Sequence, residues 1–181
     1  MVFVEAFFIS IESGKMNNFK LAPEIFKYKL DAKSLHIYCY LLANKNKRVM
    51  NYELEEKLHN LNKYTLSQCF YELKQKKLIS PKPAVLKNVI KCRYLCKDFD
   101  VQNAEVINFN KNIFGVNLSH KAFQIYLYLR ANLNSKVTNE KIIHDLKLAK
   151  ATFYKYLKEL RKNNLLSKSK NKSHNKILCI F

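Results

Sequence analysis

The feature that most constrains the fold is an internal repeat, which appears when the 181-residue chain is aligned with itself. At an offset of 88 residues, 24–49 matches 112–137; one residue drops out near His59, and the match continues at an offset of 87. Identical pairs include Ile25/Ile113, Phe26/Phe114, Ile37/Ile125, Tyr38/Tyr126, Leu41/Leu129, Glu72/Glu159, Leu73/Leu160 and Leu78/Leu165. A match over about 55 residues predicts two copies of one structural unit, which we assign to domains at 1–97 and 98–181.

Composition limits what each copy can be. Lys and Arg total 33 against 14 Asp and Glu, a net charge of +19, which predicts a polyanionic partner, either nucleic acid or an anionic membrane. Apolar residues make up 48% of the chain, enough for a packed core. The only glycines are Gly14 and Gly115, which excludes a P-loop and a dinucleotide-binding glycine fingerprint.

Each copy predicts the same order of elements. A strand-like segment and a short turn ending in Ile-Phe come first, followed by three helices and a pair of short strands. The helices are expected at 31–44, 51–59 and 63–77 in the first copy and at 119–132, 138–146 and 150–163 in the second. The strand pairs are expected at 78–80 with 89–95, and at 165–169 with 176–181. Asp31 and Ser119 are suitable N-caps, since a short oxygen side chain accepts hydrogen bonds from helix amides.

Three helices followed by a β-hairpin, with a tight turn between the second and third helices, is the winged helix-turn-helix arrangement. In the second copy, VTNEKII at 137–143, LKLAKATF at 146–153 and LKELRKNNLL at 157–166 resemble winged-helix proteins. The upstream Ile-Phe and Ile-Tyr-x-Tyr-Leu segments resemble the winged helices of replication-initiator and DnaD-like proteins of bacterial plasmids and phages. The resemblance implies a mainly α fold with small β-hairpins (α+β), built as two tandem winged helix-turn-helix domains. Asn164 and Lys77 stand where winged helices often carry glycine.

The positive charge is concentrated in the third helix and hairpin of the second copy, where 147–176 carries ten basic residues and one acid. The resemblance implies that these elements enter the major groove of DNA and touch the flanking backbone. Lys and Arg donate to guanine or phosphate, a small Ala meets a thymine methyl, and Tyr bonds a phosphate. The DNA-binding candidates of this copy are Lys150, Ala151, Thr152, Tyr154, Lys155, Lys158 and Arg161 on the helix, with Lys168, Lys170 and Lys172 in the hairpin.

The first copy has candidates at the equivalent helix positions. They are Lys63, Tyr64, Thr65, Ser67, Gln68, Tyr71 and Lys74. Gln68 is suited to a bidentate contact with adenine. Thr65, like Thr152, lies in the first helical turn, where backbone amides and the helix dipole favour a phosphate. The alternative for both helices is that the exposed face is only a solvated surface.

The first helix of each copy is apolar on nearly every side, which predicts burial all round. One domain covers only part of such a helix, so the rest is expected to pack on the sister domain or on a second chain. We therefore expect a rigid two-domain unit and, as a further option, a homodimer through this helix or through the N-terminal segment MVFVEAFFIS, interpreted as a strand. The segment 80–88, which contains Pro81 and Pro83, is expected to be a loop that either contacts a protein or reflects ordinary loop variation.

No catalytic or metal-binding constellation is evident in the sequence. The five histidines form no ligand motif, and Cys92 and Cys96 are only two potential ligands where zinc needs three or four. No carboxylates are paired at an acid/base spacing, so we expect no enzyme, cofactor, metal or small-molecule ligand. No apolar run approaches the ~20 residues of a membrane span, and the start is a poor signal peptide. An odd number of cysteines fits reduced thiols, so a bacterial cytoplasmic location, at the nucleoid or a plasmid, is expected.

The function expected from these features is specific binding of double-stranded DNA by two winged helices per chain. The biological role is either transcription regulation or origin binding for a mobile element, in plasmid or phage replication initiation or in conjugation. The alternative is a protein-interaction adaptor built on a winged-helix scaffold. RNA binding is a third option, because charge alone does not separate it from DNA binding.

Overall fold

The computed structural model describes residues 18–45, 49–86, 89–96, 107–132, 137–167 and 178–179. The chain divides into two compact units, Asn17–His120 and a second unit that contains Lys121–Phe181. Within the described residues, six α-helices, two 3-10 helices and two-stranded antiparallel sheets make the protein mainly helical with a small β component. The expected α+β class is therefore confirmed at this level.

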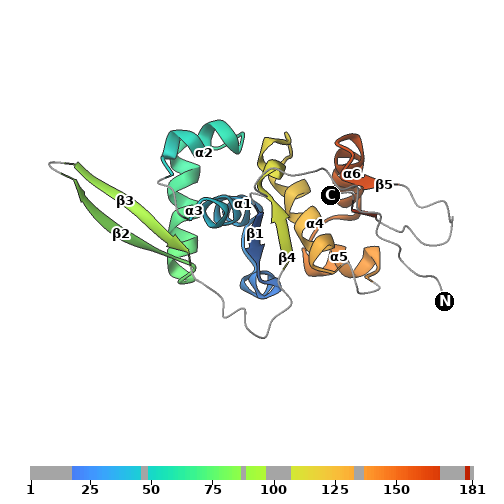
Figure 1. The fold of residues 1–181 in the computed structure, drawn as a ribbon. Coiled ribbons are helices and arrows are strands. Elements are labelled where there is room, and N and C mark those ends of the chain that lie inside the picture. Colours follow the sequence, from blue (N-terminus) through green and yellow to red (C-terminus); the bar gives the residue numbers. More distant parts are fainter. Residues whose placement is uncertain are drawn as a thin grey trace. The chain divides into compact units, whose positions relative to one another are not determined.

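The same order of elements occurs twice along the chain (Figure 1). The first series is β1 (Asn18–Leu21), η1 (Pro23–Tyr28), α1 (Ala32–Ala43), α2 (Asn51–Lys57), α3 (Lys63–Gln75), β2 (Ile79–Leu86) and β3 (Val89–Cys96). The second series is β4 (Ile107–Asn110), η2 (Lys111–Gly115), α4 (His120–Ala131), α5 (Asn139–Asp145), α6 (Lys150–Lys162), β5 (Leu166–Ser167) and β6 (Leu178–Cys179). All six helices expected from the sequence are confirmed. Each copy's Ile-Phe lies in its 3-10 helix, where Ile25 and Ile113 are buried.

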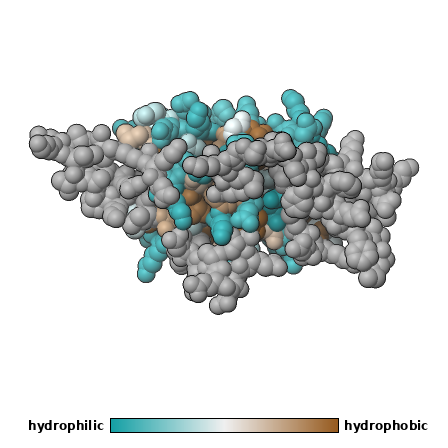
Figure 2. Space-filling view, viewed as in Figure 1, coloured by the Kyte–Doolittle hydropathy of each residue, from teal (hydrophilic) through white to brown (hydrophobic). Residues whose placement is uncertain are grey.

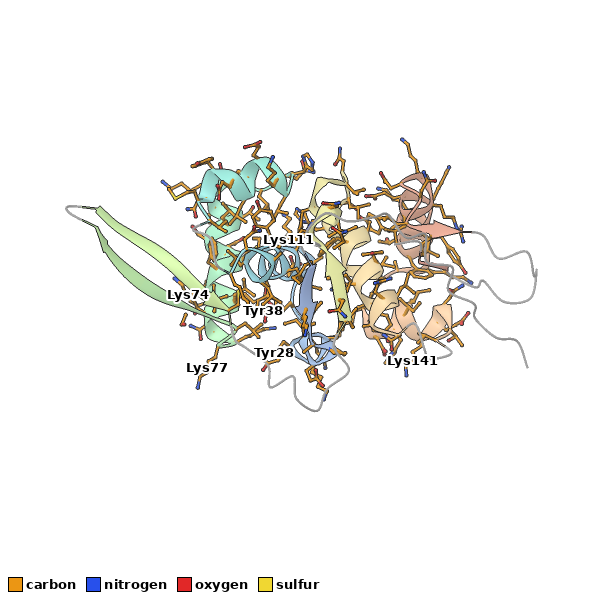
Figure 3. All side chains as sticks on the ribbon, viewed as in Figure 1. Tyr28, Tyr38, Lys74, Lys77, Lys111 and Lys141 are labelled. Carbon is orange, nitrogen blue, oxygen red and sulfur yellow. The ribbon has the colours of Figure 1, made fainter. Side chains whose placement is uncertain are left out.

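Helix α1 is the centre of the first unit. It begins after Asp31, whose carboxylate accepts the Lys33 amide at 2.8 Å, as the capping pattern predicted. Its side chains are buried on almost every side, and Tyr38 (labelled in Figure 3) is fully buried. The helix lies against β1, α3 and β3 of its own unit. Burying a large apolar side chain contributes about 1.5–3 kcal/mol, so this helix anchors the unit.

Strands β1 and β4 pair antiparallel and join the two sequence copies. Lys20 lies opposite Asn108, and these positions are equivalent in the repeat, so a local two-fold axis relates the two strands. Phe19 stacks on Phe109 at 5.3 Å and on Phe114 of η2 at 5.6 Å between ring centroids. Because of this pairing, β4 and η2 belong to the first compact unit, and the units divide at a later point than the sequence repeats.

A buried histidine pair lies in the first unit. His36 of α1 and His120, the first residue of α4, are 4% and 9% exposed, and their Nδ1 atoms are 3.0 Å apart. His120 Nε2 lies 3.0 Å from the carbonyl oxygen of His59, which accepts only from a protonated nitrogen. We therefore assign a neutral His120 whose Nδ1 accepts the Nδ1–H of His36. Phe114 stacks on the His36 ring at 5.9 Å.

Both rings resist protonation. Burial is the main cause that lowers the pKa of His36, and neighbouring His120 and His59 lower it further. Burial also lowers the pKa of His120, with further lowering from Lys33 and His59, against the opposing effects of the His59 carbonyl and Asp31. A proton added to this pair would place two N–H donors face to face, so the pair stabilises the fold only while it is neutral.

We expect stability to fall with acid. An unfolded histidine takes up a proton near pH 6.5, whereas the folded pair does so only at lower pH. Stability is therefore complete above about pH 6.5 and falls toward the folded-state pKa, by at most about 1.4 kcal/mol per pH unit for each ring. Thermal melts at pH 7.5 and pH 5.0 measure the effect. His36→Gln should shrink the difference, and His144→Gln, at an 89% exposed side chain, should leave it intact. An equal pH dependence in wild type and His36→Gln would contradict the prediction.

The third helix of each copy ends in the same way. Lys77 and Asn164, the positions expected to replace a glycine, adopt left-handed φ values of 55° and 56°. The Leu78 amide donates to the Leu73 carbonyl at 2.9 Å, and an equivalent 2.9 Å bond closes α6. Lys77 points away from the end of α3 (Figure 3). A lysine in this conformation is strained, because its Cβ approaches the neighbouring carbonyl, whereas asparagine tolerates it.

Glycine at these turns should stabilise the protein. Lys77→Gly is expected to raise the free energy of unfolding by about 0.5–1 kcal/mol, and Asn164→Gly by less. Chemical denaturation of the two variants measures the difference. Lys74→Gly, three residues earlier and inside the helix, should instead lower stability by about 1 kcal/mol. A gain at Asn164 larger than that at Lys77 would contradict the strain argument.

The hairpin of the first copy differs from the sequence prediction. The segment 80–88 was expected to be a loop, but β2 continues to Leu86 and pairs with β3, so that prediction is wrong. Pro81 and Pro83 are two residues apart, so their missing N–H groups share one edge of the strand, and the open edge of a two-stranded ribbon tolerates this. In the second copy, β5 and β6 pair antiparallel as expected over the part of this hairpin that the structure describes. Within the described residues, no helix is long and apolar enough to cross a membrane.

Candidate nucleic-acid interface

Helix α6 separates its apolar and charged residues onto opposite faces. Phe153, Leu157 and Leu160 follow the i, i+4, i+7 spacing of a helix stripe, and all three are fully buried. The predicted core stripe is therefore confirmed. With this stripe fixed in the core, the remaining arc of the helix must face solvent.

The exposed arc of α6 carries five of the seven helix residues predicted for the second copy. The exposed residues are Lys150, Ala151, Tyr154, Lys155, Lys158 and Lys162. Thr152 and Arg161, also predicted contacts, are only half-buried at the borders of this arc. The Lys155 ammonium lies 5.7 Å from the centre of the Tyr156 ring, which favours an outward cation held beside an aromatic face. Sequence reasoning missed Lys162, although its spacing of four from Lys158 places it on the same arc.

Few acidic residues accompany the lysines of α6. Glu159 is the one acid of the helix and is half-buried. At the end of α5, Asp145 accepts the Tyr128 hydroxyl at 2.5 Å and lies 3.2 Å from His144 Nδ1. The Tyr128 hydrogen bond, followed by that of His144, lowers the pKa of the Asp145 carboxyl, so it stays ionised while it ties α5 to α4. Asp145 therefore has structural partners, and the exposed positions of α6 carry lysines but no acid.

Helix α3 presents the first-copy candidates on the equivalent arc. Lys63, Tyr64, Ser67, Gln68, Tyr71 and Lys74 are exposed, and Thr65 is half-buried. Tyr64 and Tyr71 are 72% and 66% exposed, unusual values for large aromatic side chains. The Ser67 hydroxyl donates to the Lys63 carbonyl at 3.0 Å, so its proton is already used in a hydrogen bond within the helix. Sequence reasoning missed Gln75, which is exposed at the end of the helix.

The two helix pairs differ in charge. From the start of α2 to the end of α3, 51–75 carries three basic and four acidic residues, whereas 139–162, across α5 and α6, carries seven and three. Three glutamates of the first pair lie on α2, over which the surface in Figure 2 is largely hydrophilic. Within these helix pairs the positive charge therefore lies on α5 and α6, whereas α2 and α3 together are nearly neutral.

The N-termini of α3 and α6 also differ. Asn62 caps α3, because its side-chain oxygen accepts the Thr65 amide at 2.8 Å. The amide at Thr65 is thus already bonded, and the expectation that it receives a phosphate is wrong for that atom. The equivalent residue before α6 is Ala149, which makes no side-chain cap bond. The first-turn amides around Thr152 therefore have no side-chain acceptor from the cap.

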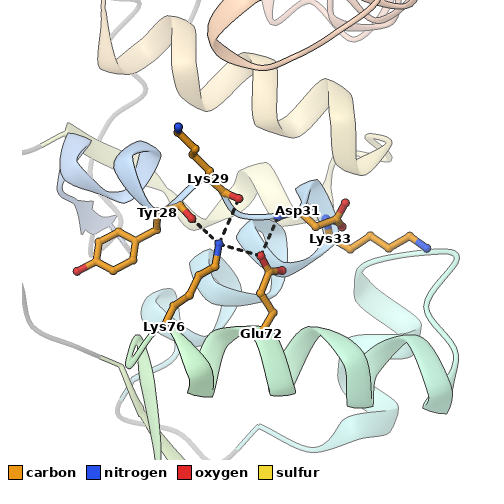
Figure 4. A network of polar contacts seen from close by, with 6 residues as sticks. All are labelled: Tyr28, Lys29, Asp31, Lys33, Glu72 and Lys76. Carbon is orange, nitrogen blue, oxygen red and sulfur yellow. Dashed lines mark hydrogen bonds and ion pairs between the residues drawn. The ribbon is translucent and has the colours of Figure 1, made fainter.

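One lysine of the first copy has a structural role that sequence reasoning missed (Figure 4). Lys76 lies 3.1 Å from the Glu72 carboxylate and donates to the carbonyl oxygens of Tyr28 and, at 3.2 Å, Lys29. Glu72 in turn accepts the Asp31 amide at 3.3 Å. This network fastens the end of α3 to the turn between η1 and α1. It also pairs the two charges, so together they add no net charge to this part of the protein.

The three predicted hairpin contacts, Lys168, Lys170 and Lys172, lie outside the described residues. Among the residues that the structure describes, no three His, Cys, Asp or Glu side chains gather in a way that holds a metal ion. Comparisons with protein-family models, with curated proteins and with solved structures gave no match to this chain. The chemistry of the α3 and α6 faces is therefore what indicates a function.

The two helix starts make opposite predictions for stability. Ala149→Asn supplies the missing cap and should raise the free energy of unfolding by about 0.5–1 kcal/mol. Asn62→Ala removes the existing cap and should lower it by about 1 kcal/mol. Thermal melts compare the two variants with wild type. If Ala149→Asn is neutral or destabilising, the start of α6 does not have the uncapped geometry described above.

Proposed function

We propose that the protein binds double-stranded DNA through two tandem winged helix-turn-helix domains. The observation that carries the proposal is the lysine face of α6, which we define as Lys150, Lys155, Lys158 and Lys162. These exposed cations share a helix with a fully buried apolar stripe. Because that stripe is already used in the core, the helix has no apolar face left for a lipid surface, which favours nucleic acid over a membrane.

The lysine face suits the major groove, which is wide enough for an α-helix. Lysine ammonium groups donate to phosphates or to guanine, and each phosphate contact releases counterions from the DNA. Ala151 is small enough to let the helix approach a thymine methyl, and the exposed Tyr154 hydroxyl is suited to a phosphate. The repeated order of three helices and a hairpin supports this use, since the third helix is the groove-entering element of winged helix-turn-helix proteins.

The biological role that we propose is site-specific transcription regulation or origin binding for a mobile element, in replication or in conjugative transfer. It rests on the sequence resemblance to initiator-type winged helices. A non-catalytic role, without cofactor, belongs to the same proposal.

A protein-interaction adaptor is the second candidate. The exposed Tyr64 and Tyr71 on a nearly neutral helix favour it, because tyrosine is enriched at protein interfaces. The homodimer expected through the first helix or the N-terminal strand stays a prediction. Helix α1 lies against elements of its own unit, and the N-terminal segment lies outside the described residues.

Gel-shift titrations with a mixed-sequence duplex test the DNA proposal. Wild-type affinity should fall steeply between 50 and 200 mM salt, as counterion release requires. Lys155→Ala with Lys158→Ala should weaken binding about tenfold or more at low salt and reduce the log–log salt slope by about 2. The matched control is Lys27→Ala with Lys57→Ala, which removes two exposed lysines from η1 and α2 and should cost much less. The absence of binding at low salt would refute the proposal, and equal losses in both double variants would refute the role of α6.

A further inference from the structure

Equivalent positions on α3 and α6 carry different chemistry on the same scaffold. Both helices have thirteen residues, the same buried stripe and the same left-handed ending. Gln68, Tyr71 and Gln75 stand on α3 where α6 has three of its lysines. Tyr64 stands where α6 has Ala151. We call Tyr64, Gln68, Tyr71 and Gln75 the polar face of α3; all four are exposed.

The polar face of α3 has little attraction for phosphate. Its four side chains are uncharged, and the neighbouring α2 exposes Glu55 and Glu56. Glu72 and Lys76 neutralise each other in the network that fastens α3 to η1. At the start of the helix, the Asn62 side-chain oxygen accepts a hydrogen bond from the Thr65 amide. The exposed cations of α3 are Lys63 and Lys74, near its two ends, against four on the lysine face of α6, so α3 releases fewer counterions and is expected to bind DNA more weakly than α6.

The same face is well equipped to discriminate between bases. The Gln68 amide offers a donor and an acceptor in one plane, the pattern that matches adenine N7 and N6 in the major groove. Tyr64 and Tyr71 lie four residues before and three residues after Gln68, so the two rings stand on the same face one turn away on either side. A lysine, in contrast, is satisfied by a phosphate in DNA of any sequence.

We infer that the two helices divide the work: α6 supplies affinity for any DNA, and α3 selects the sequence, with Gln68 reading an A·T pair. The inference rests on the proposed DNA binding. Because both helices belong to one chain, binding of α6 raises the local concentration of α3 at the DNA. A weak, uncharged face then adds affinity only where the base edges match its amide.

Repeat-matched substitutions test this division. The best duplex is selected from a random pool with wild-type protein, and Kd is measured for it and for a scrambled duplex across a salt series. Gln68→Ala should weaken the selected duplex by about 5- to 150-fold and leave both the scrambled duplex and the salt slope unchanged. Lys155→Ala should weaken both duplexes equally and reduce the salt slope by about 0.9. When single base pairs of the selected duplex are changed in turn, one A·T pair should be found whose change weakens wild-type binding but leaves binding by Gln68→Ala unaltered.

Exchanging the two residues sharpens the test. Gln68→Lys should raise the salt slope by about 0.9 and tighten the scrambled duplex while it loses the sequence preference. Lys155→Gln should behave as Lys155→Ala. Both positions are exposed, so thermal melts should stay close to wild type. Equal loss on both duplexes for Gln68→Ala, or a wild type without sequence preference, would overturn the inference while leaving DNA binding intact. A wild type that binds no duplex at low salt would instead overturn the proposed function itself.

Discussion

The antiparallel pairing of β1 with β4 is the contact on which the first unit depends. Only eight residues form it, yet with it β4 and η2 belong to the first unit and not to the unit that contains the rest of the second sequence copy. Phe109 and Phe114 then stack on Phe19, and His120 comes within hydrogen-bond distance of His36 on α1. A two-stranded sheet this short is not stable by itself, so the aromatic and histidine contacts that it brings together are what hold it.

The repeat supplies one scaffold with two surfaces. Buried positions are strongly alike in the copies, because each third helix must place a three-residue apolar stripe in a core and end in a left-handed turn. Exposed positions carry no such constraint. These positions are lysines on α6 and tyrosines and glutamines on α3. A side-chain N-cap, Asn62, precedes α3, whereas Ala149 before α6 makes no such bond. This contrast on a common backbone is the basis of both functional proposals.

Sequence reasoning was sufficient wherever a signal was local and periodic. The six helices, the buried stripe of α6 and the Asp31 cap all follow from spacing and from side-chain chemistry within a few residues. The left-handed turns at Lys77 and Asn164 were indicated by the resemblance to winged helices, which often carry glycine there. The exposed lysines of α6 follow from the same geometry. Sequence reasoning failed where a partner distant in the chain decides the outcome. Segment 80–88 became mostly strand because β3 pairs with it, and Lys76 became structural because the carbonyl of Tyr28 lies within reach.

The sequence by itself determined the repeat, the helices, the apolar stripes and the position of the positive charge, because each is written in the order of residues along one segment. Only the tertiary structure decided that β1 pairs with β4, that His36 and His120 form a buried hydrogen-bonded pair, and that Lys76 donates to the carbonyl oxygen of Tyr28. The physical reason is that these contacts join residues dozens of positions apart. Their free energy depends on burial and distance, which no local pattern encodes.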